Sequence, residues 1–266
     1  MISLVTLLKE ATSSPKAVIL AGAPGAGKTS IVGDIISGLG LNVLNIDDHF
    51  IKNLKDAGVS LDLKRADAEG RSKAAKAMQA AKKTYDEELA QEIKNKGNIV
   101  IDGTAASYKK TEELKNTLEE TGYDVFMVYV YSSLEKSLRK NEDRFERSKG
   151  EDRSLMPAIV MQTWANVTKN FIPYKDLFGG KFVATTKDKK LSDAQDLDDI
   201  IEKYIVPFIP TDTKPKDEKA KARSKKQKEK LQQDIKSLMS KSNMDQVLPF
   251  IVSPEEAQQK LTQFLG

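Results

Sequence analysis

The chain has 266 residues, of which 39% are hydrophobic and 31% are charged, and its formal net charge is +4. This length is sufficient for one large domain with a buried core plus an accessory segment. The absence of cysteine excludes disulfides and thiolate metal sites, and the single histidine, His49, excludes a multi-histidine metal site.

Short apolar runs alternate with helical patterns along most of the chain. The apolar runs predict five strands, at residues 17–21, 42–46, 98–104, 124–131 and 181–185. Helices are predicted at residues 29–37, 68–94, 107–121, 133–147 and 157–171 and through Leu197 to Tyr204, whereas 51–67 is expected to be irregular. Strands that alternate with helices predict a three-layer α/β domain with a mainly parallel sheet.

A phosphate-binding loop follows the first predicted strand. The pattern G-x-x-x-x-G-K-S/T, followed by one serine, is met by Gly22, Ala23, Pro24, Gly25, Ala26, Gly27, Lys28, Thr29 and Ser30. In such loops the lysine reaches the β- and γ-phosphates and the hydroxyl of the next residue holds Mg²⁺, so these roles are expected for Lys28 and Thr29. The loop therefore predicts binding of a nucleoside triphosphate with Mg²⁺.

Carboxylates follow the second and third predicted strands. Asp47 and Asp48 end the second strand, and Asp102, with Thr104 two residues on, ends the third. Ligands of open α/β sheets bind beyond the carboxyl ends of the strands. A carboxylate there could accept the proton of an attacking hydroxyl, assist Mg²⁺ through water or bind substrate hydroxyls. The alternative for Asp47 or Asp48 is a cap on the following segment.

Arginines gather after the fourth predicted strand. Arg144 and Arg147 are three residues apart on one helical face, and Arg153 lies in the next loop. Arginines stabilise the charge of a phosphoryl group in transfer. From composition alone, however, any single one of them fits better as a solvated ion pair with a neighbouring acid, which contributes little.

Taken in order, these motifs resemble those of the zeta-toxin family of P-loop kinases. The resemblance covers about residues 17–185. It rests on the phosphate-binding loop, Ile46–Phe50, Ile101–Thr104, Gly122–Tyr123, Asp143–Phe145 and Arg153 ahead of Pro157. In the type examples, these kinases phosphorylate a hydroxyl of UDP-activated amino sugars.

The resemblance implies roles for single residues. Asp48, two residues before Phe50, matches the family's catalytic base, and Arg144 and Arg153 match the arginines that clamp the phosphates. Asp102 matches a substrate-contacting carboxylate that is usually Glu, and Thr104 and Asp47 are expected beside it on the substrate side. The implied protein is a P-loop kinase that uses ATP and Mg²⁺, with a small-molecule hydroxyl such as that of a nucleotide sugar as acceptor.

Two other functions fit the same residues. A polynucleotide 5′-hydroxyl kinase would carry a similar phosphate-binding loop, base and arginines. A nucleotide-binding structural or docking component of an assembly would need no acceptor, although intact Lys28, Thr29 and Asp48 favour an enzyme.

The composition changes at Pro210, which predicts a kinase-like domain at 1–209 and a basic linker with a helical extension at 210–266. Residues 214–230 hold nine Lys or Arg against three acidic residues, so at most weak nucleic-acid binding is expected. An apolar face after it predicts docking to a protein partner and consists of Leu231, Ile235, Leu238 and Met239. A final helix is predicted to start at Ser253.

No apolar run approaches the length of about 18 residues that a membrane span needs. The first ten residues lack the basic start and the long apolar core of a signal peptide and predict a short amphipathic helix. We therefore expect a cytoplasmic protein that does not bind membranes.

Overall fold

The computed structural model describes residues 14–31, 33, 40–187 and 247–266, together with the isolated positions 203, 229, 233 and 237. Its strands are β1 (Lys16–Ala21), β2 (Asn42–Asn45), β3 (Ile99–Asp102), β4 (Asp124–Tyr131), β5 (Phe182–Thr186) and β6 (Ile251–Val252). They form one parallel sheet in the order β2-β3-β1-β4-β5-β6. The predicted α/β class is confirmed, and β4 has the central position expected for its continuous apolar run.

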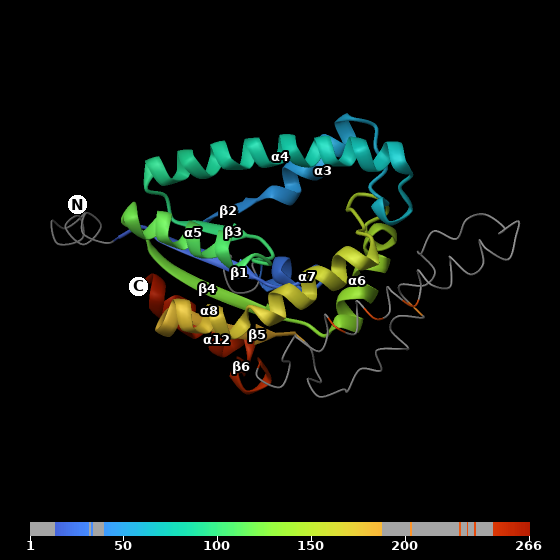
Figure 1. Cartoon of the computed structure of the whole chain (residues 1–266). Helices are drawn as coiled ribbons and strands as arrows, with labels where there is room; N and C mark the ends of the chain where they lie inside the picture. Colours follow the sequence, from blue (N-terminus) through green and yellow to red (C-terminus); the bar gives the residue numbers. More distant parts are fainter. Residues whose placement is uncertain are drawn as a thin grey trace, which may run out of the picture.

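Helices cover both faces of this sheet (Figure 1). They are α2 (Lys28–Ile31), α3 (Ile46–Asp56), α4 (Ala68–Asn95), α5 (Tyr108–Glu120), α6 (Leu134–Arg147), α7 (Pro157–Lys169), α8 (Phe171–Phe178) and α12 (Pro254–Leu265). Short 3-10 turns are η2 (Leu63–Arg65), η3 (Gly179–Lys181) and η5 (Leu248–Phe250). Among the described residues, no helix is long and apolar enough to cross a membrane.

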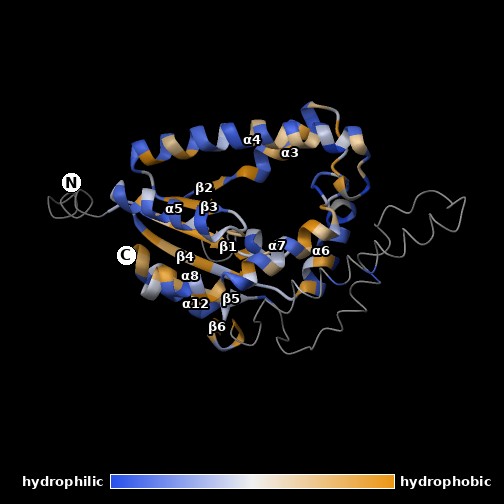
Figure 2. Ribbon diagram, in the orientation of Figure 1, coloured by the Kyte–Doolittle hydropathy of each residue, from blue (hydrophilic) through white to orange (hydrophobic). Residues whose placement is uncertain are grey.

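The core has two layers because alternate residues of a strand point to opposite faces of the sheet. On one face, Ala17 and Ile19 of β1 pack with side chains of α5, α7 and α8. On the other face, Val18 and Leu20 pack with side chains of α2 and α12. Figure 2 shows the result: β4 is mostly apolar, whereas the outer surface of α4 is mostly hydrophilic. Burial on both faces explains why the central strands have no polar alternation.

The segment after β2 differs from the prediction. Residues 51–67 were expected to be irregular, but α3 continues to Asp56. Phe50 and Leu54 lie one helical turn apart and pack on Ala77 and Ala81 of α4. This small separate core fixes α3 and the first half of α4 to each other beyond the edge of the sheet.

The end of the chain returns to the sheet. Ile251 of β6 pairs with Ala184 of β5, and Leu261 and Phe264 of α12 pack on the face that includes Phe126. The predicted boundary at 209/210 therefore does not separate residues 247–266 from the sheet. The predicted final helix is confirmed as α12, whose N-cap is Ser253.

Several predictions fall on residues that the structure does not describe. These are the N-terminal helix at 1–10, most of the second half of the helix at 29–37, most of the helix through Leu197 to Tyr204, most of the basic segment 214–230 and the apolar face of Leu231, Ile235, Leu238 and Met239.

Candidate active site

A cavity of about 840 Å³ lies beyond the carboxyl ends of β1, β2 and β3. The phosphate-binding loop, α3, α4, α6, α7 and the loop between α6 and α7 contribute to its wall. Its polar lining includes most of the predicted site residues: Lys28, Thr29, Asp47, Asp102, Thr104, Arg144 and Arg153. The fold thus brings together side chains that are up to 125 positions apart in the sequence, from Lys28 to Arg153.

The phosphate-binding loop packs closely against α6. Gly25 has a φ of +78°, and a Cβ atom at this position would lie 2.9 Å from the backbone oxygen of Ser137. Only glycine meets both conditions without strain. At the start of the loop, the N–H of Gly22 donates to the backbone oxygen of Thr104 at 3.1 Å, which joins the loop to the end of β3.

Lys28 lies over the loop to which it belongs. Its Nζ donates to the backbone oxygens of Gly22 at 2.9 Å and Ala23 at 3.2 Å. Burial lowers the pKa of Lys28, and the carboxylates of Asp102 and Asp47 oppose this shift. Two backbone carbonyl groups therefore hold the lysine at the cavity. A bound phosphate would take their place as the partner of Nζ.

Asp47 and Asp48 occupy different positions on α3. The side chain of Asn45 caps this helix by accepting from the N–H of Asp47 at 2.9 Å. Adjacent residues of a helix point about 100° apart, so the two side chains project in different directions. Asp47 lines the cavity, whereas Asp48 is exposed and is not part of its lining. Partial loss of solvent around its carboxyl group, and then the nearby Asp47 carboxylate, raise the pKa of Asp48.

The two carboxylates have different partners. Asp48, to which the resemblance assigns the role of base, lies near enough to Asp102 and Asp152 for their charges to interact, whereas Asp47 interacts with Lys28 and pairs with Arg153. His49, next in the chain, lies within 2.8 Å of the Glu88 carboxylate through its Nε2. It therefore has a structural partner on α4.

Each of the two expected phosphate-binding arginines is paired with a carboxylate. Arg144 donates from Nε to Asp152, and Nη2 of Arg153 lies 2.5 Å from Oδ1 of Asp47. Arg153 is only 6% exposed, and its guanidinium lies 5.2 Å from the ring centroid of Phe50. Within the described residues, its Nε has no hydrogen-bond partner. A buried charge with one unused donor, at the edge of an open cavity, is suited to bind an anion.

Asp102 lies at the bottom of the site. It is 8% exposed and accepts a hydrogen bond from Nδ2 of Asn45 at 3.1 Å. Burial raises the pKa of Asp102, and the positive charge of Lys28 opposes that shift. The folded protein therefore binds the proton of this carboxyl more tightly than the unfolded chain does.

Asp102→Asn should stabilise the protein near neutral pH. Because the folded pKa is raised, the stabilisation from Asp102 is complete below the unfolded value of about 3.9 and is lost as pH rises through the folded pKa. Asparagine does not ionise, so the variant does not lose this stabilisation as pH rises, and its side-chain oxygen can still accept the hydrogen bond from Asn45. We expect a Tm a few degrees above wild type near pH 7 and no difference near pH 3, measured by calorimetry. The same change at the exposed Asp56, Asp56→Asn, is the control. An equal Tm for wild type and Asp102→Asn at pH 7 would contradict the raised pKa of Asp102 in the folded protein.

The donor set fits a magnesium nucleotide. The Thr29 side chain lines the same cavity as Lys28, Asp47 and Asp102. Mg²⁺ prefers oxygen ligands and usually binds through one or two protein groups plus substrate phosphates. In the described ranges, no group of three His, Cys, Asp or Glu side chains is arranged to hold a metal ion. The neighbouring Ser30 hydroxyl accepts a hydrogen bond from Lys187.

Much of the cavity wall was missed by the sequence interpretation. Apolar side chains line it from several segments, and Arg71 and Lys140 add cations. Ala74 and Met78 lie four residues apart on one face of α4, where they pack on the small core of α3 and α4 and also line the cavity. A helical period shows which residues share a face and does not show whether that face covers a core or a cavity.

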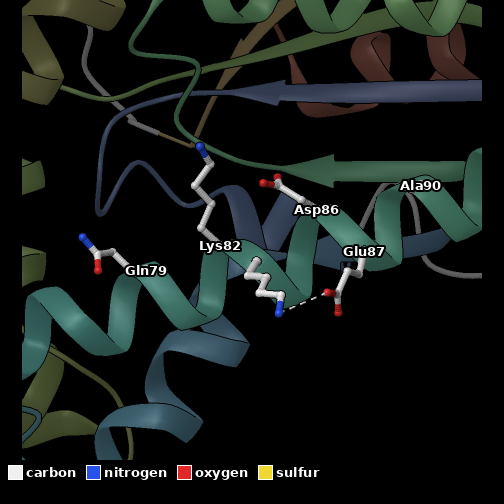
Figure 3. Close-up of a pocket in the computed structure, with 6 residues that line it drawn as sticks. Gln79, Lys82, Asp86, Glu87 and Ala90 are labelled. Carbon is white, nitrogen blue, oxygen red and sulfur yellow. Dashed lines mark ion pairs between the residues drawn. The ribbon is translucent and has the colours of Figure 1, made fainter.

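A second hollow, of about 430 Å³, lies on the outer surface of α4. It is lined by exposed side chains of this one helix, among them Lys83 and Glu87, which form an ion pair at 3.9 Å (Figure 3). Side chains that a single helix presents to solvent do not enclose a ligand. The candidate site is therefore the larger cavity.

The phosphate-binding loop on a parallel sheet, with carboxylates and arginines around one cavity, defines the protein as having a P-loop kinase-like fold. The model of the family described as "Zeta toxin" matches residues 4–184. The chain belongs to the zeta toxin family, and the resemblance seen in its motifs is confirmed.

Two solved structures of one complex show the same fold. The crystal structure of AvrRxo1-ORF1:AvrRxo1-ORF2 with sulphate ions is 18% identical with a TM-score of 0.53, and the match covers 69% of this chain and 58% of that chain. The same complex with ATP has a TM-score of 0.52 at 18% identity and the same coverage. A structure from the PezAT toxin–antitoxin system of Streptococcus pneumoniae is 14% identical over 87% of this chain and 94% of that chain, with a TM-score of 0.46. A comparison with curated proteins gave no match.

Proposed function

We propose that this protein transfers the γ-phosphoryl group of Mg·ATP to a hydroxyl group of a small molecule. The observation that carries the proposal is the convergence of Lys28, Asp47, Asp102 and two arginines on one cavity. Membership of the zeta toxin family supports it, as does the AvrRxo1-ORF1:AvrRxo1-ORF2 structure that contains ATP. Both PezAT and AvrRxo1 are described as systems of two proteins, which supports the expectation of a protein partner.

Phosphate binding would rearrange the charges of the site. Lys28 would bind the β- and γ-phosphates, and Thr29 would hold Mg²⁺, which neutralises charge on the phosphates. Phosphate oxygens would compete with Asp152 for Arg144 and with Asp47 for Arg153. When Arg153 turns to the phosphoryl group, Asp47 loses its cation and can accept the proton of the attacking hydroxyl. The nucleotide would thereby release the base that the reaction needs.

The acceptor hydroxyl would lie between Asp47 and Asp102. Nucleotide sugars, the acceptors of the type examples, are the first class to test. Asp102 stands where the family usually has Glu, and its side chain is one methylene shorter, so the acceptor has room for a different position. A transfer screen with γ-labelled ATP against nucleotide sugars, nucleosides and 5′-hydroxyl oligonucleotides tests the proposal. Label on oligonucleotides alone would favour the polynucleotide kinase, and no label on any class would contradict a kinase function.

Lys28→Ala should weaken Mg·ATP binding about 10- to 100-fold, because it removes a charged hydrogen bond to phosphate. Isothermal titration calorimetry measures this change directly. Lys187→Ala, which removes the amine that donates to Ser30 next to the loop, is the matched control and should change the affinity about threefold or less. Unchanged affinity in Lys28→Ala would show that the loop does not bind the triphosphate.

A further inference from the structure

Part of the large cavity has an apolar wall. Away from the phosphate-binding loop, its lining comes from η2, α4 and the start of α7: Leu63, Ala66, Ala74, Met78, Met156 and Ile159. Ile159 is 45% exposed, which is unusual for a large apolar side chain in the part of the chain that the structure describes. Apolar groups from three separate segments therefore face one common space, where contact with water is unfavourable.

The apolar wall begins beside the proposed base. Asp47 and Phe50 lie one helical turn apart on α3, and both line the cavity. The Arg153 guanidinium contacts both of them, with its Nη2 on Asp47 and its plane near the Phe50 ring. Lys28 and Arg153 lie at the γ-phosphate end of the proposed site, and Phe50 links that end to the apolar wall.

Arg71 and Arg147 are exposed cations at the same cavity. Nη1 of Arg71 donates to the backbone oxygen of Ala66 at 2.6 Å, and Nη2 of Arg147 donates to that of Lys140 at 3.1 Å. Each guanidinium has five N–H groups, so these bonds orient the side chain and leave donors for an anion.

We propose that the acceptor is an amphiphilic anion: a hydroxyl compound with an apolar group that packs on Met78 and Ile159 and an acidic group that Arg71 or Arg147 binds. This inference rests on the proposed phosphoryl transfer and specifies its substrate class. A wholly polar sugar would lose hydrogen bonds to water without replacing them on this wall.

The test uses 8-anilinonaphthalene-1-sulfonate, an aromatic anion whose fluorescence rises in apolar sites, as the probe. It is titrated into the full-length protein, with and without a saturating amount of the magnesium complex of the ATP analogue AMPPNP. We expect binding in both conditions, and about tenfold weaker binding to Ile159→Asp and to Met78→Asp. The control is Val43→Asp on β2, because Val43 is 46% exposed and lies outside the cavity lining. It should bind the probe as wild type does.

Three results would overturn the inference: no probe bound to the nucleotide-saturated wild type, displacement of the probe by AMPPNP, or equal weakening by Val43→Asp. Displacement would assign the apolar wall to the nucleotide. AMPPNP binding measured by calorimetry on the same variants reports whether each is folded. If the wild-type protein did not bind AMPPNP, the proposed function itself would be contradicted. This result is measured by calorimetry and is separate from the pattern of probe binding.

Discussion

Asp47→Asn is expected to lower the rate of phosphoryl transfer by about 10²–10⁴, the usual contribution of general acid–base catalysis. Asparagine has nearly the same shape as aspartate but cannot accept the proton of the acceptor hydroxyl. Mg·ATP affinity should change little, because Lys28 and the loop amides still bind the phosphates. Initial rates of label transfer from γ-labelled ATP, together with calorimetric affinities, measure the two quantities separately.

The matched control is Asp48→Asn, the same change one residue along α3. Since Asp48 is exposed and outside the cavity lining, we expect a loss of less than about tenfold. If Asp48→Asn lost more activity than Asp47→Asn, the assignment implied by the family resemblance would be right, and α3 would have to turn when substrates bind.

Arg153→Lys should lower transfer by about 10³–10⁵, the range observed when an arginine that stabilises the transferring phosphoryl group is lost. Lysine keeps the charge but lacks the planar set of donors that binds Asp47 in the free protein and phosphate oxygens in the complex. Rates are measured at saturating Mg·ATP, so that weaker nucleotide binding does not contribute.

Arg65→Lys serves as the control for that change. Arg65 is an exposed arginine of η2 that pairs with Asp62 at 3.4 Å, and its replacement should leave the rate unchanged. A lower Tm with nearly normal transfer in Arg153→Lys would mean that Arg153 is a structural link between α3 and the loop after α6.

The sequence predicted the phosphate-binding loop and the strand ends because each depends on a short local pattern. A buried apolar run followed by glycines and Lys28 is compatible with few structures other than a strand and a phosphate-binding loop. The apolar runs of β1, β3 and β4 are continuous because these strands are buried on both faces of the sheet. The directions in which Asp47 and Asp48 point could not be predicted from a short local pattern. They depend on the phase of α3, which one side chain, Asn45, sets by capping the helix.

Long-range pairings could not be predicted from the sequence. Arg153 and Asp47 are 106 residues apart, and neither neighbourhood indicates the other. The apolar wall has the same origin, since Met78 and Ile159 come from two helices, α4 and α7, that are far apart in the sequence. In the sequence, each fits an ordinary amphipathic helix.

The short strand β6 has a consequence for aggregation. An exposed sheet edge can pair with another chain, and natural proteins limit this risk with very short or proline-flanked edge strands. Ile251 and Val252 form a strand of only two residues, between Pro249 in η5 and Pro254 at the start of α12. A chain shortened before residue 247 would instead present the five residues of β5 as its edge. The last twenty residues therefore protect the sheet from pairing with other molecules, a task separate from any chemistry in the cavity.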